Sequence, residues 1–146
     1  MGPFTKAGAD GVGTRWVVYT DTCADLETGS IKYGLTGGKG AIAAVDPDLS
    51  QDIAAVMDPG GYPWAAFVDP ATDPPTLRVA ARIDDEWTTV DLAAGFFHAP
   101  GMAFDARGIL HVAAVDPAYG VRDFAWDGAG VRARGVAAGS LRGPCR

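Results

Sequence analysis

Short apolar runs framed by aspartate and glycine recur along the chain at a nearly constant spacing. Three of them read DGVGTRWVVYTD (residues 10–21), DPGGYPWAAFVD (58–69) and DARGILHVAAVD (105–116). Their first aspartates are 48 and 47 residues apart, and so are their last aspartates. A basic residue follows each run at a similar interval, at Lys32, Arg78 and Arg122. Because two independent registers agree, the pattern predicts an internal repeat.

The local sequence of each repeat is typical of short strands joined by tight turns. Each run opens with Asp at the first position and Gly at the fourth, which is the preference of a type I turn. Apolar segments at 53–57 and 101–104 precede two of these turns, and fourth strands are predicted at 40–46, 86–92 and 130–136. No segment has a helical period long enough for a helix. Four short strands per repeat predict a β-propeller blade.

The second strand of each repeat is mostly apolar on both of its faces. In the middle repeat, Trp64, Ala66 and Val68 point to one side, and Ala65 and Phe67 point to the other. A sheet with one wet face would alternate apolar and polar residues, whereas a sheet covered on both sides need not. The pattern therefore predicts sheets that stack face to face, as the blades of a propeller do.

The predicted fold is a single all-β repeat domain over residues 1–146, a β-propeller segment of three four-stranded blades. The approximate blade boundaries are 1–50, 51–97 and 98–142. Propellers typically close with about four to eight blades, so three are too few. The chain is expected to be either a part of a longer propeller or half of a six-bladed ring that two copies complete by self-association.

Charge and composition exclude several classes of partner. Twelve Lys and Arg residues against 18 Asp and Glu residues give a net charge of −6, which argues against nucleic acid. Asp, Pro or Gly interrupts every apolar stretch within ten residues, so no membrane insertion is expected. The N-terminal MGPFTKAGAD has no hydrophobic segment of the signal-peptide type.

The two cysteines leave the compartment open. Cys23 and Cys145 are 122 residues apart and lack metal-ligand spacing, so neither a metal nor a cofactor is expected. A disulfide between them would indicate an oxidising, extracellular or periplasmic location. The alternative is two ordinary thiols, because spacing alone does not decide pairing.

Two long segments resemble the repeats of bacterial β-propeller proteins, including those with Asp-box (BNR-like) turns between the third and fourth strands. These segments are MAFDARGILHVAAVD…VRDFAWDG and AAVMDPGGYPWAAFVD…LRVAARIDDEWTTVDL, and the resemblance covers nearly the whole chain. RIDDEW keeps Asp84 and Trp87 of the Asp-box pattern but lacks its hydroxyl residue and its glycine. AWDGAGV keeps Asp127 and Gly128 but has Val131 at the aromatic position. In the resembling proteins such turns are structural, so the resemblance implies a fold rather than an activity.

The two histidines differ in what they suggest. His111 holds the repeat position that Trp16 and Trp64 hold in the other runs, so it is predicted to pack rather than to catalyse. His98 lies on a connection between repeats, and connections on rigid scaffolds carry function, so it is a candidate ligand contact. Phe96 and Phe97 beside it are predicted to fill the core.

The connections after the second strands differ in length and are the expected place for binding specificity. The aspartates that precede them, Asp21, Asp69 and Asp116, are predicted to accept backbone N–H groups in the following turn. Asp25, Glu27 and Tyr119 are exposed candidates for contact with a polar ligand, together with His98. The first connection lacks the ligand spacing of a calcium loop.

The predicted function is that of a non-catalytic binding or scaffolding module that contacts a protein or a glycan through its face loops. The alternative is a fragment or subunit of a propeller glycoside hydrolase or lyase of the sialidase type. Such a site needs facing carboxyl groups and a cluster of arginines on the inner strands. Segments 53–57 and 101–104 contain neither Arg nor Glu, so no catalytic residue is predicted in this chain.

Overall fold

Twelve strands in three antiparallel sheets make up the part of the chain that the structure describes. It is a computed structural model, and it describes residues 5–9, 13, 15–21, 29–35, 38–45, 53–69, 72–84, 86–118 and 120–137. Every described element is a strand or a turn, which confirms the all-β prediction. Nothing in these ranges forms a helix of the length and apolarity that would be needed to cross a membrane.

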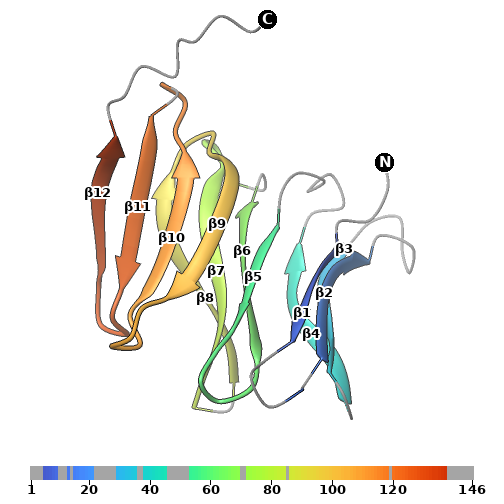
Figure 1. The fold of residues 1–146 in the computed structure, drawn as a ribbon. Coiled ribbons are helices and arrows are strands. Elements are labelled where there is room, and N and C mark those ends of the chain that lie inside the picture. The colour runs from blue at the N-terminus through green and yellow to red at the C-terminus, as the bar shows by residue number, and fades with distance from the viewer. Residues whose placement is uncertain are drawn as a thin grey trace, which may run out of the picture.

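Each sheet is a four-stranded meander in which consecutive strands pair. Sheet A contains β1 (Thr5–Ala9), β2 (Arg15–Asp21), β3 (Gly29–Leu35) and β4 (Gly38–Val45). Sheet B contains β5 (Ala54–Met57), β6 (Pro63–Asp69), β7 (Thr76–Ile83) and β8 (Glu86–Ala94). Sheet C contains β9 (His98–Phe104), β10 (Leu110–Val115), β11 (Val121–Trp126) and β12 (Val131–Ala137). The three sheets stand side by side with sheet B in the middle (Figure 1).

The turns between the first and second strands follow the sequence prediction in sheets B and C. The N–H of Gly61 donates to the carbonyl of Asp58 at 3.1 Å, and Gly108 donates to Asp105 at 2.9 Å. Both glycines have positive φ, 87° at Gly61 and 78° at Gly108, a conformation that disfavours any side chain. The corresponding turn of sheet A begins at Asp10, which lies outside the described residues.

The aspartates at the ends of the second strands behave differently from one another. Asp116 accepts the N–H groups of Ala118 and Gly120 on Oδ1, at 2.9 and 3.0 Å, as the sequence predicts. Asp69 is buried, and its carboxylate accepts from the guanidinium of Arg78 on the next strand. The side chain of Asp21 lies outside the described part.

Sheet B is buried on both faces, as the apolar pattern of its second strand predicts. Towards sheet A, Ala65, Phe67 and Ala80 pack with Val18. Towards sheet C, a larger cluster joins residues of sheet B with residues of sheet C and of the connection before it: Ala54, Trp64, Ala66, Leu77, Val79 and Ala81 meet Phe97, Leu110, Val112, Ala114, Phe124 and Trp126. Burial of these apolar side chains from water is what holds the sheets together.

Sheet C is buried on one face only, which corrects the prediction made for its second strand. Leu110, Val112 and Ala114 of β10 are buried, whereas Ala113 is exposed and the side chain of His111 is 36% exposed. In the described part of the chain no sheet covers this outer face. His111 therefore lies on an open face and not in the core.

The pairing register assigns equivalent positions to the three sheets. Lys32, Arg78 and Arg122 lie opposite Tyr19, Phe67 and Ala114, respectively. Trp16, Trp64 and His111 each stand three residues before those partners. Residues that share a place in the register are called equivalent below.

Candidate functional site

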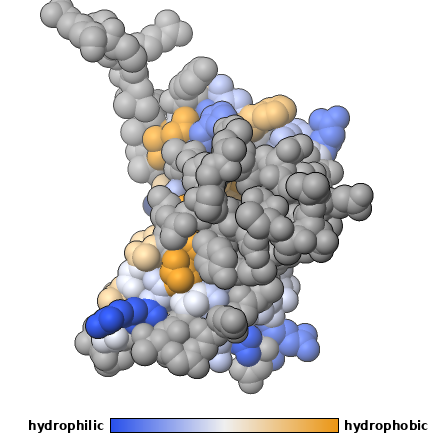
Figure 2. All heavy atoms as spheres, turned by 90° about the vertical axis from the view of Figure 1, so that its right-hand side faces the viewer, coloured by the Kyte–Doolittle hydropathy of each residue, from blue (hydrophilic) through white to orange (hydrophobic). Residues whose placement is uncertain are grey.

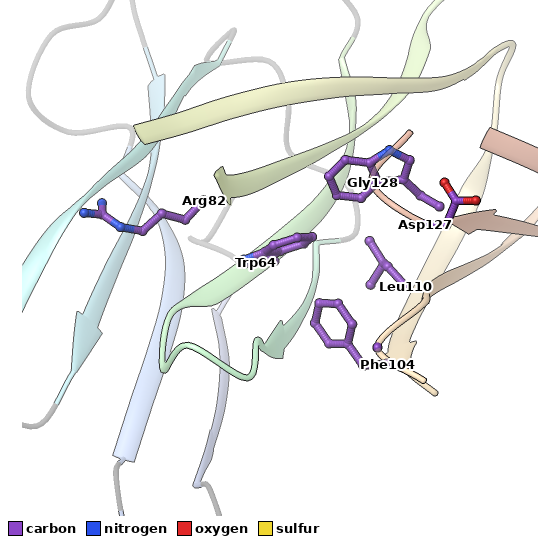
Figure 3. A pocket seen from close by; sticks show the side chains of 8 residues that line it. Trp64, Arg82, Phe104, Leu110, Asp127 and Gly128 are labelled. Atoms are coloured by element: carbon purple, nitrogen blue, oxygen red, sulfur yellow. The ribbon is translucent and has the colours of Figure 1, made fainter. Parts of the chain in front are cut away.

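A cavity of about 250 Å³ opens between sheets B and C. It lies where Trp64 of β6 faces the turn between β9 and β10 and the turn between β11 and β12 (Figure 3). Its lining is mostly apolar and includes Trp64, Arg82, Phe104, Gly108, Leu110, Trp126, Asp127 and Gly128. Small-molecule sites are typically concave and apolar with a few placed polar groups, and this cavity has that character.

Three aromatic rings from two sheets form the wall of the cavity. The ring of Trp64 lies 5.1 Å from that of Phe104 and 5.5 Å from that of Trp126, measured between centroids. The indole N–H of Trp64 donates to Oδ2 of Asp58 at 2.6 Å, which fixes the orientation of the ring. Trp64 and Trp126 are each less than a tenth exposed, so the cavity meets only the uncovered part of their rings, an apolar surface that the C–H groups of a sugar ring can contact.

Asp127 supplies a carboxylate at the edge of the cavity. Its Oδ1 accepts the backbone N–H groups of Ala129 and Gly130 at 2.9 and 3.1 Å, and Arg132 lies 3.3 Å from Oδ2. The backbone bond from Ala129, then that from Gly130, and the charge of Arg132 lower the pKa of Asp127. The carboxylate is therefore ionised at neutral pH and accepts hydrogen bonds at the rim.

The Arg82 side chain borders the cavity, but its guanidinium group lies away from it. Its guanidinium lies 4.2 Å from the ring of Tyr62 and 5.8 Å from that of Trp87. Figure 3 shows the side chain extending away from Trp64. Trp87 in turn lies 5.5 Å from the ring of Tyr33 in sheet A. The cation is thus stacked on aromatic rings at the junction of sheets A and B.

His111 lies between two carboxylates on the outer face of sheet C, outside the cavity. Its Nδ1 is 3.0 Å from Oδ2 of Asp123, and its Nε2 is 3.6 Å from Oδ2 of Asp105. The pKa of Asp105 is lowered to about 2, chiefly by the backbone N–H of Ile109. Within the described residues, no group of three or more His, Cys, Asp or Glu side chains is arranged to hold a metal ion.

Of the ligand-contact candidates predicted from the sequence, the structure describes His98, and His98 does not line this cavity. His98 is exposed and begins β9, opposite Val115, whereas Leu110 of the cavity stands at the other end of β10. Asp25, Glu27 and Tyr119 lie outside the described residues, so a ligand contact at any of these four positions stays a prediction. The two cysteines, Cys23 and Cys145, also lie outside the described part.

The two phenylalanines beside His98 separate in the structure. Phe97 is 4% exposed and belongs to the core between sheets B and C, as predicted. Phe96 is 60% exposed, so the prediction that it fills the core is wrong. Phe97 packs with its ring centroid 5.5 Å from that of Phe124, whereas the neighbouring Phe96 is turned to solvent.

Trp64, Trp126 and Asp127 are cavity residues that are not among the candidates predicted from the sequence. The dipeptide Trp126-Asp127 ends a third strand at a turn, which places an aromatic ring beside a carboxylate. Trp64 follows the turn at Asp58 by a few residues. An aromatic residue beside an aspartate-glycine turn in two successive repeats was the available signal.

Comparison with solved structures shows a likeness of fold. No family model matches the chain, and no curated protein matches it. The solved structure of a fucose lectin from Kordia zhangzhouensis in complex with methyl-fucoside superposes with a TM-score of 0.53 at 15% sequence identity. The likeness covers 90% of this chain and 97% of that chain. At this identity it shows a shared β-rich fold.

Proposed function

We propose that the chain is a non-catalytic carbohydrate-binding module, built as a β-propeller segment of three four-stranded blades. The stacked meanders, with sheet B buried on both faces, support the propeller architecture. The likeness to a lectin over nearly the whole of both chains supports both the architecture and the kind of ligand.

The observation that carries the proposal is the pairing of indole rings with a carboxylate in one cavity. A sugar ring has apolar C–H faces and polar hydroxyl edges, so it needs a flat apolar wall and a fixed acceptor. Trp64 and Trp126 provide the wall, and Asp127 provides the acceptor at its edge. The cavity is smaller than the roughly 300–1,000 Å³ usual for drug-sized ligands, which suits one terminal sugar ring.

The competing hydrolase function lacks a second carboxyl group at the cavity. Asp127 is the acidic residue among the described side chains that line it. Glycoside hydrolysis uses two carboxyl groups on opposite sides of the scissile bond. Asp105 and Asp123 pair with Arg107 and His111 on the outer side of sheet C. A binding role therefore fits the lining residues better than hydrolysis does.

Titration of the full chain with monosaccharides, followed by tryptophan fluorescence, tests the proposal. Methyl-fucoside, galactose, mannose and N-acetylglucosamine form the panel. We expect at least one of them to saturate a fluorescence change, and Asp127→Asn to weaken its binding about 3- to 10-fold through the lost charge. Asp84→Asn, which changes an exposed carboxylate on the turn after β7, serves as the matched control and keeps the affinity. Saturable binding that Asp127→Asn leaves unchanged, or no binding across the panel, overturns the proposal.

A further inference from the structure

The two tryptophans of the cavity differ in what their indole nitrogens contact. The N–H of Trp64 donates to Oδ2 of Asp58 at 2.6 Å, within the turn before its own strand. The N–H of Trp126 has no hydrogen-bond partner in the part of the chain that the structure describes. Trp126 is 8% exposed and lines the cavity. One indole donor of the cavity is therefore engaged by the protein, and the other is not.

A buried indole N–H that lacks a protein partner calls for an acceptor from outside the protein. The indole nitrogen only donates, and a buried tryptophan usually finds an acceptor for it. Because more than nine-tenths of the Trp126 side chain is covered, little of its surface is left on which an acceptor can reach the N–H. Water fills this role when no ligand is present, and an oxygen of a ligand can replace the water.

The other polar groups of the lining side already have partners. The N–H of Gly108 donates to a carbonyl of its own turn at 2.9 Å. The guanidinium of Arg82 is stacked on an aromatic ring away from the cavity. Oδ1 of Asp127 accepts two backbone N–H groups, and Arg132 lies 3.3 Å from Oδ2. Among the described side chains of the lining, Trp126 therefore supplies the donor for a ligand, and Asp127 supplies the acceptor.

The indole donor is a feature of the third repeat. Trp126 stands four residues after Arg122, and the equivalent residue of sheet B, four residues after Arg78, is Arg82. The donor lies between sheets B and C and not at the sheet A end of the stack. Seen from that end, hydrophilic and hydrophobic side chains are interspersed over the coloured part of the surface (Figure 2).

We propose that the indole N–H of Trp126 donates to a hydroxyl oxygen of the bound sugar, so that the site recognises one edge of a terminal sugar residue. Trp64 contributes only its ring, because Asp58 holds its N–H. A hydroxyl group that leaves water needs a partner, and the lining offers few, so the other hydroxyls of the sugar stay in water. A site built to bond one hydroxyl rejects an analogue that lacks it. This role of Trp126 rests on the proposed sugar binding.

The indole N–H signals of the protein test the bond directly. The chain has four tryptophans, so labelling with ¹⁵N-tryptophan gives four indole signals, which single Trp→Phe variants assign. Without sugar, we expect the N–H of Trp126 to exchange with water at least about tenfold faster than that of Trp64. Saturation with the best binder among methyl-fucoside, galactose, mannose and N-acetylglucosamine should slow the exchange of the Trp126 N–H at least about threefold and leave that of Trp64 unchanged.

A series of deoxy sugars separates the hydrogen bond from the bulk of the ring. Each hydroxyl of the best-binding sugar is replaced by hydrogen in turn. The wild type is expected to bind one of these derivatives about 3- to 10-fold more weakly than the parent sugar. Trp126→Phe keeps an aromatic ring but removes the N–H, so it should bind that derivative and the parent sugar equally. Trp87→Phe, at the junction of sheets A and B, is the matched control and should keep the wild-type preference.

The outcomes distinguish this role of Trp126 from the sugar site itself. If no sugar of the panel saturates, both are overturned. If a sugar saturates but the exchange of the Trp126 N–H does not slow, or if Trp126→Phe keeps the wild-type preference among the deoxy sugars, the role of Trp126 alone is overturned. Circular dichroism shows whether each variant is folded. If Trp126→Phe unfolds, the other three variants still assign the wild-type Trp126 signal by elimination, and the exchange measurement decides.

Discussion

The indole nitrogen of Trp64 lies 2.6 Å from Oδ2 of Asp58, the residue that opens the turn before its strand. Oδ1 of the same carboxylate accepts the backbone N–H of Tyr62 at 2.9 Å. One side chain therefore holds both the turn and the ring that walls the cavity. The orientation of Trp64 in the proposed sugar site depends on the carboxylate of Asp58 in the turn. A substitution at Asp58 should therefore change sugar binding.

Replacement of Asp58 by asparagine should separate these two roles. An asparagine keeps an acceptor for Tyr62 but turns its NH₂ group towards the indole N–H, and two donors cannot bond each other. We expect Asp58→Asn to lower the free energy of unfolding by about 1–2 kcal/mol and to weaken sugar binding. Chemical denaturation and fluorescence titration measure the two effects. Unchanged stability and affinity would show that the hydrogen bond from Trp64 to Asp58 contributes to neither of them.

Trp126 should contribute to sugar binding through its ring rather than through its bulk. Trp126→Leu keeps an apolar side chain but removes the flat face, so the aromatic contribution of about 0.5–1.5 kcal/mol is lost. The affinity for the best sugar should fall about 2- to 10-fold, as measured by titration. Trp87→Leu, at the junction of sheets A and B, is the control and should leave the affinity unchanged. An equal loss in both variants would point to a general loosening of the stack.

The ionisation of Asp105 should make part of the free energy of unfolding depend on pH in the acidic range. Its pKa is lowered from 3.8 to about 2, chiefly by the N–H of Ile109, so folding favours the ionised form. Its contribution is fully present above the unfolded-state pKa and is lost as the pH falls through 3.8 towards about 2. Asp105→Asn should flatten this part of the stability profile, as measured by urea unfolding from neutral to strongly acidic pH. A variant whose profile parallels that of the wild type contradicts the assignment.

Two glycines of sheet C should respond differently to the same substitution. Gly108 has a φ of 78° and open space where a methyl group would stand, so the cost of Gly108→Ala is that of the backbone, about 1–2 kcal/mol. Gly101 lacks a positive φ, and it also has open space where a methyl group would stand. Gly101→Ala should therefore change the free energy of unfolding by less than about 0.5 kcal/mol. Thermal and urea unfolding of the two variants compare them directly. Equal losses would mean that the turn does not need its glycine.

The strands and turns are predictable from the sequence because their signals are local. An aspartate four residues before Tyr62 and a glycine at position 61 are enough to specify the turn that the structure contains. The apolar residues at 64–68 likewise predict a strand that is covered on both sides. The turn and the strand depend on neighbours in the chain, whereas burial of both faces of the strand depends on the sheets on either side.

The cavity and the open face depend on contacts between sheets, which no single repeat encodes. In the sequence, Trp126 looks like an ordinary residue at the end of a strand. Its place in the cavity is visible only in the structure, where its ring centroid lies 5.5 Å from that of Trp64 in the preceding sheet. Similarly, His111 occupies the position of a buried tryptophan, but its exposure depends on whether a further sheet follows. Position in the stack, rather than position in the repeat, decides the environment of both residues.

The consecutive strand order of the three sheets also has a consequence for folding. Every described strand pairs with a strand next to it in the sequence. Each sheet can therefore form its hydrogen bonds from local segments alone, without contacts between distant parts of the chain. A solitary sheet B, however, would expose two apolar faces at once. The smallest cooperative unit is therefore a pair of adjacent sheets, and amide hydrogens of β6 and β7 should be the last to exchange with solvent.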